Sequence, residues 1–146
     1  MNHGRFKYEK LSKYPHLGPK DAAIWEKFMA MYPDEYKNVD YDCWVGEGAF
    51  PEEESKSDIF KDNFKDLTKK RIDVCGTKEY GKVDCIEIRP HAGSSALGSV
   101  LCNFYLHKDD LGEHLHGKII ITDRAQADMA RLCEADNIKL IEVGEI

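Results

Sequence analysis

The sequence predicts an α/β fold in which helices pack on a mixed central sheet. Two observations lead to this prediction. Three segments place apolar residues at helical spacing, and five shorter segments have the alternation or the apolar runs of strands. Three of the strands come consecutively, and helices separate the later ones, which is typical of a sheet with antiparallel and parallel parts. A length of 146 residues fits one domain, which we expect to span 1–146.

The first half of the chain is predicted to contain one helix and one strand. The helix covers Asp21–Met31, with Pro19 before it and Pro33 after it. The strand covers Tyr41–Val45 and stops at two nearby glycines. The stretch 50–67 is polar and acidic, and we expect it to be an insertion within the domain.

Two β-like segments follow and are predicted to form a hairpin. They cover Arg71–Cys75 and Val83–Arg89, and the glycine-containing link GTKEYGK joins them. Pro90 ends the second segment because proline has no amide hydrogen to donate to a neighbouring strand.

The remaining segments alternate between helix and strand. Ser94 or Ser95 is predicted to cap a helix, and the polar stretch HKDDLGEHLHGK after it is predicted to be a loop. A short buried strand is expected over Lys118–Thr122, a helix over Gln126–Ala135 and a last strand over Ile138–Val143.

Charge and hydropathy exclude several classes of protein. No apolar run approaches the roughly 20 residues that span a bilayer, so we expect no membrane partner. The N-terminus lacks the apolar segment of a secretory signal, and the five cysteines form no metal-binding or disulfide pattern. The net charge of −6 argues against a protein that coats nucleic acid by bulk attraction.

The residues with the clearest chemical meaning lie in RIDVCGTKEYGKVDCIEIRP. Because side chains alternate along a strand, Glu87 and Arg89 should point to the same side, and Asp73 stands on the neighbouring strand. Two carboxylates suit a hard cation such as Mg²⁺, which activates water and neutralises charge on a phosphodiester. A simpler alternative stays open, in which these acids pair with nearby basic residues and hold no metal.

An Asp on one hairpin strand followed by Glu-x-basic on the next resembles the signature of the PD-(D/E)XK nuclease superfamily. The segments RIDVCG, IEIRPHAGSSALGSVL and IIITDRAQADMARLCEADNIKLIEV are similar to short phage-encoded members, and the resemblance covers about 40–143 without the acidic insertion. It implies a restriction-endonuclease-like αβββαβ core, followed here by a C-terminal helix and strand.

The resemblance also implies roles for individual residues. Asp73, Glu87 and Arg89 take the catalytic positions, and Asp73 and Glu87 bind Mg²⁺ or Mn²⁺. Members often add an acidic residue from the first helix or strand, for which Glu47 is the candidate and Glu26 a poorer one. Arg89 replaces the usual lysine, and since arginine stays protonated it is unsuited to act as a general base.

Further residues are candidates for contact with nucleic acid. Lys69 and Lys70 belong to a basic run close to the acidic pair, and His91 follows directly after the motif. Ser99 occupies about the position from which a helix residue assists in members of the superfamily.

Two main functions are therefore expected. The first is a divalent-metal-dependent DNA phosphodiesterase. The second is a non-catalytic structural protein of a phage virion, a head-completion, neck or tail component that retains the nuclease fold and binds other phage proteins or copies of itself. A DNA-binding protein that does not cut is a third alternative. The expected location is the cytoplasm of a host cell or the virion.

Overall fold

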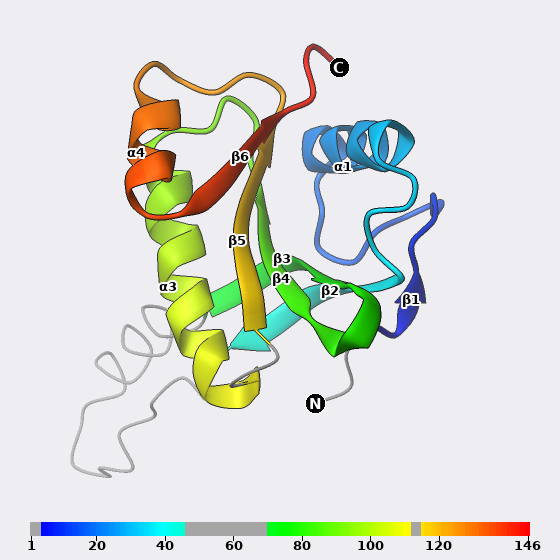
Figure 1. Ribbon diagram of the computed structural model, residues 1–146. Helices are drawn as coiled ribbons and strands as arrows, with labels where there is room; N and C mark the ends of the chain where they lie inside the picture. Colours follow the sequence, from blue (N-terminus) through cyan, green and yellow to red (C-terminus); the bar gives the residue numbers. More distant parts are fainter. Residues whose placement is uncertain (1–3, 46–69, 112–114) are drawn as a thin grey trace, which may run out of the picture.

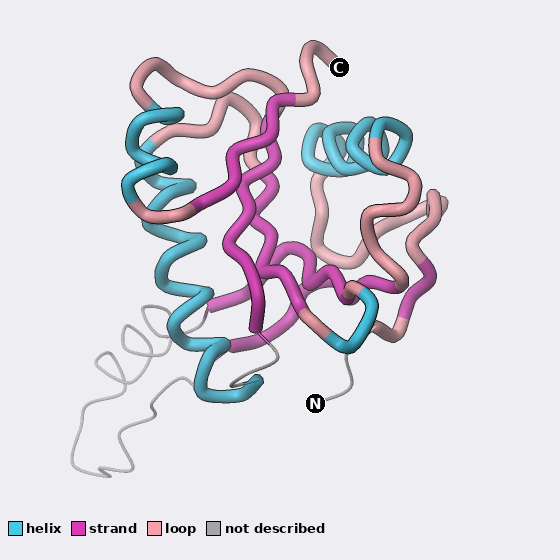
Figure 2. Tube along the Cα trace, in the orientation of Figure 1, coloured by secondary structure: helices cyan, strands magenta, loops and turns pink. Residues whose placement is uncertain are grey.

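The computed structural model describes residues 4–45, 70–111 and 115–146, and these form one six-stranded mixed sheet with helices on both faces. The strands lie side by side in chain order from β1 to β6 (Figures 1 and 2). The pairs between β1 and β4 are antiparallel, and β4–β5 and β5–β6 are parallel. The predicted α/β class, the mixed sheet and the αβββαβ order are confirmed.

The first half of the structure runs from β1 to the hairpin. Its elements are β1 (Phe6–Lys7), α1 (Pro19–Met31), β2 (Asn38–Val45), β3 (Lys70–Thr77), the 3-10 turn η1 (Glu79–Gly81) and β4 (Val83–Ile88). Helix α1 starts at Pro19, two residues before the predicted start, because proline is well suited to the first turn of a helix. The predicted insertion at 50–67 lies outside the described residues.

The second half contains α3 (Ser94–Leu111), β5 (Leu115–Thr122), α4 (Met129–Ala135) and β6 (Ile138–Glu142). The predicted polar loop was wrong over most of its length. Helix α3 continues through His107, which is completely buried, and β5 begins at Leu115. Helix α4 starts three residues later than predicted, after Asp128 in a left-handed conformation.

Strand β5 shows how the helices on the two faces share the sheet. Ile119 and Ile121 pack in the core beneath α1, and Ile120 packs in the core beneath α3 and α4. This alternation is the two-residue period of a strand that is buried on both faces. In the described part of the chain, none of the helices combines the length and apolar character needed to cross a bilayer.

The closed end of the β3–β4 hairpin is fixed by Tyr36. Its hydroxyl donates to Asp84 Oδ2 at 2.9 Å, and its ring lies against Gly76, where a Cβ atom would come within 2.5 Å of ring carbons. Tyr36 is only 5% exposed, so the ring has little room to move away. A glycine at position 76 is therefore required for close packing.

We predict that Gly76→Ala lowers the free energy of unfolding by about 1–3 kcal/mol, because the added methyl group overpacks a fixed ring. Gly98→Ala is the matched control. It lies on α3 with no other atom within 4 Å of the added Cβ, and should stabilise the fold by up to about 1 kcal/mol. Urea unfolding of the two variants measures both effects, and equal stability would contradict the packing argument.

Candidate active site

The candidate site forms where β3 and β4 separate. The two strands pair from Thr77↔Val83 to Val74↔Ile86, and the next residues along them are Asp73 and Glu87. Asp73 Oδ2 accepts the backbone N–H of Ile88 at 2.9 Å. The carboxylate thus takes the place of a backbone acceptor, which satisfies an amide at the point where the ladder ends.

Arg89 joins Glu87 to helix α3. Its guanidinium donates to Glu87 Oε2 at 2.5 Å through one terminal nitrogen and to Ser95 Oγ at 2.7 Å through the other. Its backbone N–H donates to the carbonyl of Ile121 on β5 at 3.0 Å. The alternative pairing of Glu87 with Arg89 is therefore present, inside the same cluster as Asp73.

The environment raises the pKa of both carboxyl groups. Burial is the main cause for Asp73, whose pKa rises to about 6, and the charge of Asp21 raises it further. The pKa of Glu87 rises to about 8 because of burial, with repulsion from Asp73 as the next cause. The positive charge of Arg89 lowers both values but does not offset burial. Such a pair gains strongly from a cation.

Asp21 is the acidic residue of the first helix that faces the site, and the sequence argument missed it. Its charge raises the pKa of both Asp73 and Glu87, and the charge of Arg89 acts on Asp21 in turn. Asp21 stands three and four residues before Ile24 and Trp25, which are fully buried, so it shares their helix face. An acid on the apolar face of α1 was the available signal.

Glu26, the poorer of the two other candidates, is not in this cluster. Glu26 accepts a hydrogen bond from the Tyr14 hydroxyl at 2.8 Å, and Glu47 lies outside the described residues.

The predicted nucleic-acid contacts are only partly described. Lys69 lies outside the described residues, and Lys70 begins β3. Ser99 is half-buried on α3. His91 is exposed, and its backbone N–H donates to Asp123 Oδ1 at 2.7 Å in the loop after β5.

A basic pair that the sequence argument did not select lies close to Asp73. Arg71 is two residues before it on β3, and a guanidinium nitrogen lies 3.1 Å from His16 Nδ1. The same guanidinium is 3.7 Å from an Asp42 oxygen. His16 also lowers the pKa of Asp73, which places this residue within electrostatic reach of the site.

The donor set of the site fits Mg²⁺. Within 4–45, 70–111 and 115–146, no group of three or more His, Cys, Asp or Glu side chains is arranged to hold a metal ion. Mg²⁺ needs no such group, because it commonly binds through one or two carboxylates and completes its shell with water and substrate phosphate. Asp73 and Glu87 provide two carboxylates, each with a second oxygen beyond the hydrogen bonds above.

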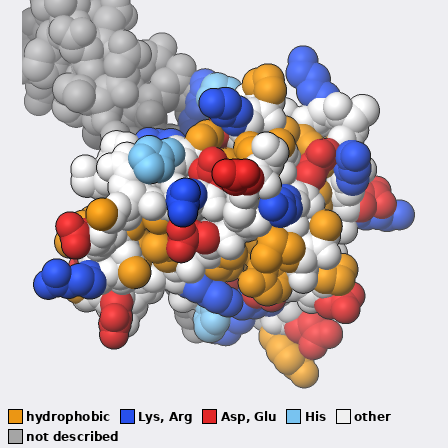
Figure 3. All heavy atoms as spheres, turned by 90° about the horizontal axis from the view of Figure 1, so that it is seen from above, with side chains coloured by type: hydrophobic (Ala, Val, Ile, Leu, Met, Phe, Trp, Pro, Cys, Tyr) orange, Lys and Arg blue, Asp and Glu red, His pale blue; other side chains and the backbone are white. Residues whose placement is uncertain are grey.

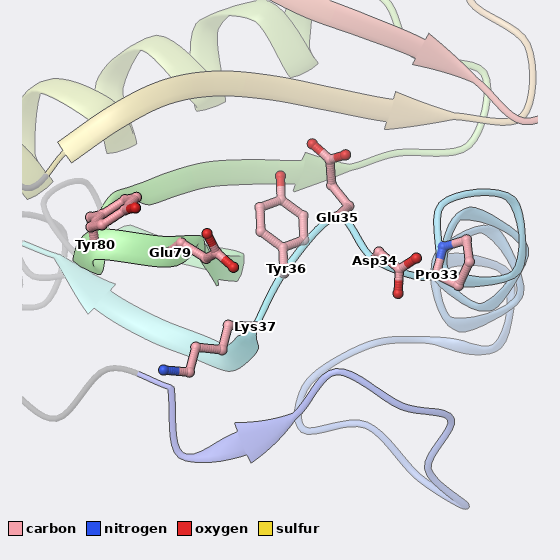
Figure 4. Close-up of a pocket in the computed structure, with 7 residues that line it drawn as sticks. All are labelled: Pro33, Asp34, Glu35, Tyr36, Lys37, Glu79 and Tyr80. Atoms are coloured by element: carbon pink, nitrogen blue, oxygen red, sulfur yellow. The ribbon is translucent and has the colours of Figure 1, made fainter.

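A separate hollow of about 600 Å³ lies at the closed end of the hairpin (Figure 4). Its lining consists of Pro33, Asp34, Glu35, Tyr36, Lys37, Glu79 and Tyr80. Three carboxylates and one lysine make this lining acidic, so it would repel phosphate. None of the predicted site residues belongs to it.

The surface seen from above shows no broad basic region either (Figure 3). On the described part of that face, Lys and Arg side chains alternate with Asp and Glu. Any contact with nucleic acid there must therefore depend on individual cations and not on a uniform positive field.

Comparison with known proteins gives two distant structural similarities. A structure described as a repair endonuclease from Pyrococcus abyssi is 19% identical, with a TM-score of 0.45, over 51% of this chain and 33% of its own. An EndoMS–dsDNA2 complex is 12% identical, with a TM-score of 0.48, over 94% of this chain and 51% of its own. The chain thus spans about half or less of either protein. No protein-family model and no curated protein matches it.

The raised pKa values predict that the stability of the fold decreases with rising pH. Unfolded carboxyls release their protons near pH 4, but the folded state retains them up to about pH 6 at Asp73 and about pH 8 at Glu87. The folded state therefore binds more protons in this window. The free energy of unfolding should fall across it by on the order of a few kcal/mol.

Glu87→Gln removes the contribution of Glu87 to the difference in bound protons between the folded and unfolded states. We expect its stability to exceed that of the wild type increasingly as pH rises from 4 to 8, measured by urea unfolding at several pH values. Glu134→Gln, an exposed change on α4, is the matched control and should follow the wild type. Parallel curves for wild type and Glu87→Gln would show that Glu87 is not perturbed.

Proposed function

We propose that this chain is a nuclease of the PD-(D/E)XK type, a divalent-metal-dependent phosphodiesterase that acts on DNA. The observation that carries the proposal is the pair of the buried Glu87 and the half-buried Asp73, held at the point where two strands separate, with Arg89 bound to Glu87. Core packing does not require two carboxylates there, and their burial costs stability. The proposal takes the chain as one domain with an insertion at 50–67.

Each residue of the candidate site would have a separate role in this reaction. Asp73 and Glu87 would hold Mg²⁺ or Mn²⁺, and Asp73 is fixed for this by the N–H of Ile88. When bound, such an ion would activate a water and neutralise phosphate charge. Arg89 binds the phosphate and stabilises the negative charge that develops on it, because a guanidinium stays protonated and presents several donors.

Cleavage of linear, circular and single-stranded DNA with Mg²⁺, Mn²⁺ or EDTA tests this function. We expect cleavage with either metal and none with EDTA. Asp73→Asn or Glu87→Gln should lower the rate at least about 100-fold, because each removes a charge from the reacting centre. Glu134→Gln is the control and should cut like the wild type. Cleavage that survives the double variant would refute the site assignment.

Arg71 and His16 lie beside the acidic pair and would bind the DNA backbone next to the cleaved phosphate. We predict that Arg71→Ala weakens binding to all DNA sequences alike and lowers the slope of log affinity against log salt by about 1. Arg131→Ala, on the exposed surface of α4, is the control and should change neither value. Fluorescence anisotropy at several salt concentrations measures both quantities. An unchanged slope in Arg71→Ala would place the DNA elsewhere.

One observation favours a role without cutting. Arg89 stands where the superfamily signature has lysine, and it cannot become a general base. A structural protein of a phage virion, or a DNA-binding protein, would tolerate this replacement. Salt-sensitive DNA binding without cleavage would support the DNA-binding role. The absence of DNA binding together with formation of large assemblies would support the virion role, with other phage proteins or copies of the chain as partners.

A further inference from the structure

Arg89 is held from two sides in the candidate site. One terminal nitrogen donates to Glu87 Oε2 at 2.5 Å, and the other donates to Ser95 Oγ at 2.7 Å. Glu87 is 5% exposed, so its side of this part-buried contact is shielded from water. Two tethers at one planar group fix the position of its charge. The guanidinium is therefore a resident cation of the site.

This cation takes one of the carboxylate oxygens that a metal ion could otherwise use. Asp73 Oδ2 accepts the Ile88 N–H, and Glu87 Oε2 accepts from Arg89. Among the described residues, Asp73 Oδ1 and Glu87 Oε1 are the oxygens of the pair without a hydrogen bond. One carboxylate oxygen from each residue suffices for a single Mg²⁺, which takes its other ligands from water and phosphate.

The charges of the site also favour a single divalent ion. Asp21, Asp73 and Glu87 carry three negative charges when ionised, and Arg89 carries one positive charge. One divalent ion balances the remaining two negative charges. A second would leave the cluster with two net positive charges and no added ligand, which is costly in a partly buried site. Loss of Arg89 would release Glu87 Oε2 as a further ligand and reduce that excess to one charge.

We propose that the Arg89 guanidinium takes the place of a second divalent ion, so that the site binds one ion per chain. This inference rests on the proposed function, because it concerns the metal site of that function. Arg89 then performs by a fixed charge part of what the second ion performs in two-metal sites, where two ions clamp the attacking and leaving oxygens. About a third of its side chain is exposed, at 35%, which leaves it accessible to phosphate.

Counting bound Mn²⁺ on the purified full chain tests the proposal directly. Calorimetric titration gives the stoichiometry, and electron paramagnetic resonance of free Mn²⁺ gives it independently, both without substrate. We expect one ion in the wild type and two in Arg89→Met, which removes the charge but keeps the length of the side chain. Arg89→Lys keeps the charge and should bind one.

Arg71→Met is the matched control for general electrostatics. It removes a positive charge near Asp73, at a residue whose guanidinium contacts His16 and Asp42. Its affinity for Mn²⁺ should rise while the count stays at one. Two ions in this variant would overturn the proposal, because loss of any nearby charge would then suffice.

The remaining outcomes separate this inference from the proposed function. Two ions in the wild type, or one ion in a folded Arg89→Met, would refute the proposal that Arg89 replaces a second ion. The proposal of a metal-dependent nuclease would still stand. No ion in the wild type or any variant would refute metal dependence itself, and the inference would fail with it. Thermal unfolding followed by circular dichroism confirms that each variant is folded, and Arg89→Lys gives the comparison with least disturbance.

Discussion

The separation of β3 from β4 after Val74 and Ile86 is the constraint on which the rest of this structure depends. A sheet that continued its ladder would pair the backbone of Asp73 and leave no opening. Because the strands part, the Ile88 N–H needs another acceptor, and the Asp73 carboxylate supplies it at 2.9 Å. One hydrogen bond thus satisfies the backbone and fixes a side chain of the candidate site, and Glu87 stands on β4 one residue before Ile88.

The fold tolerates this cluster because apolar contacts surround it. Trp25 and Phe28 stack on one face of the sheet, and Ile120 packs against the helices on the other. The repulsion among these carboxylates is offset in part by Arg89, which also binds Ser95 at the start of α3. The acids of the candidate site therefore lower the stability of the fold, which is a common feature of functional sites.

Local patterns predicted most of the elements but not all of their ends. The polar residues from His107 onward predicted a loop. Helix α3 instead continues to Leu111, with the His107 side chain completely buried. The two-residue β1 carried no periodic signal and exists through its pairing with β2. The acid of the first helix was sought at Glu26, which faces Tyr14, and the structure brings Asp21 to the site instead.

Local patterns were enough to predict the α/β class, the hairpin and the motif Asp73, Glu87 and Arg89, because alternation and turn residues act over a few neighbours. Which charges meet depends on the packing of distant elements. The approach of Asp21 to Asp73 depends on how α1 packs on the sheet, and the contact between Arg89 and Ser95 depends on where α3 begins. These are long-range consequences of burying two apolar faces at once, and no local pattern contains them.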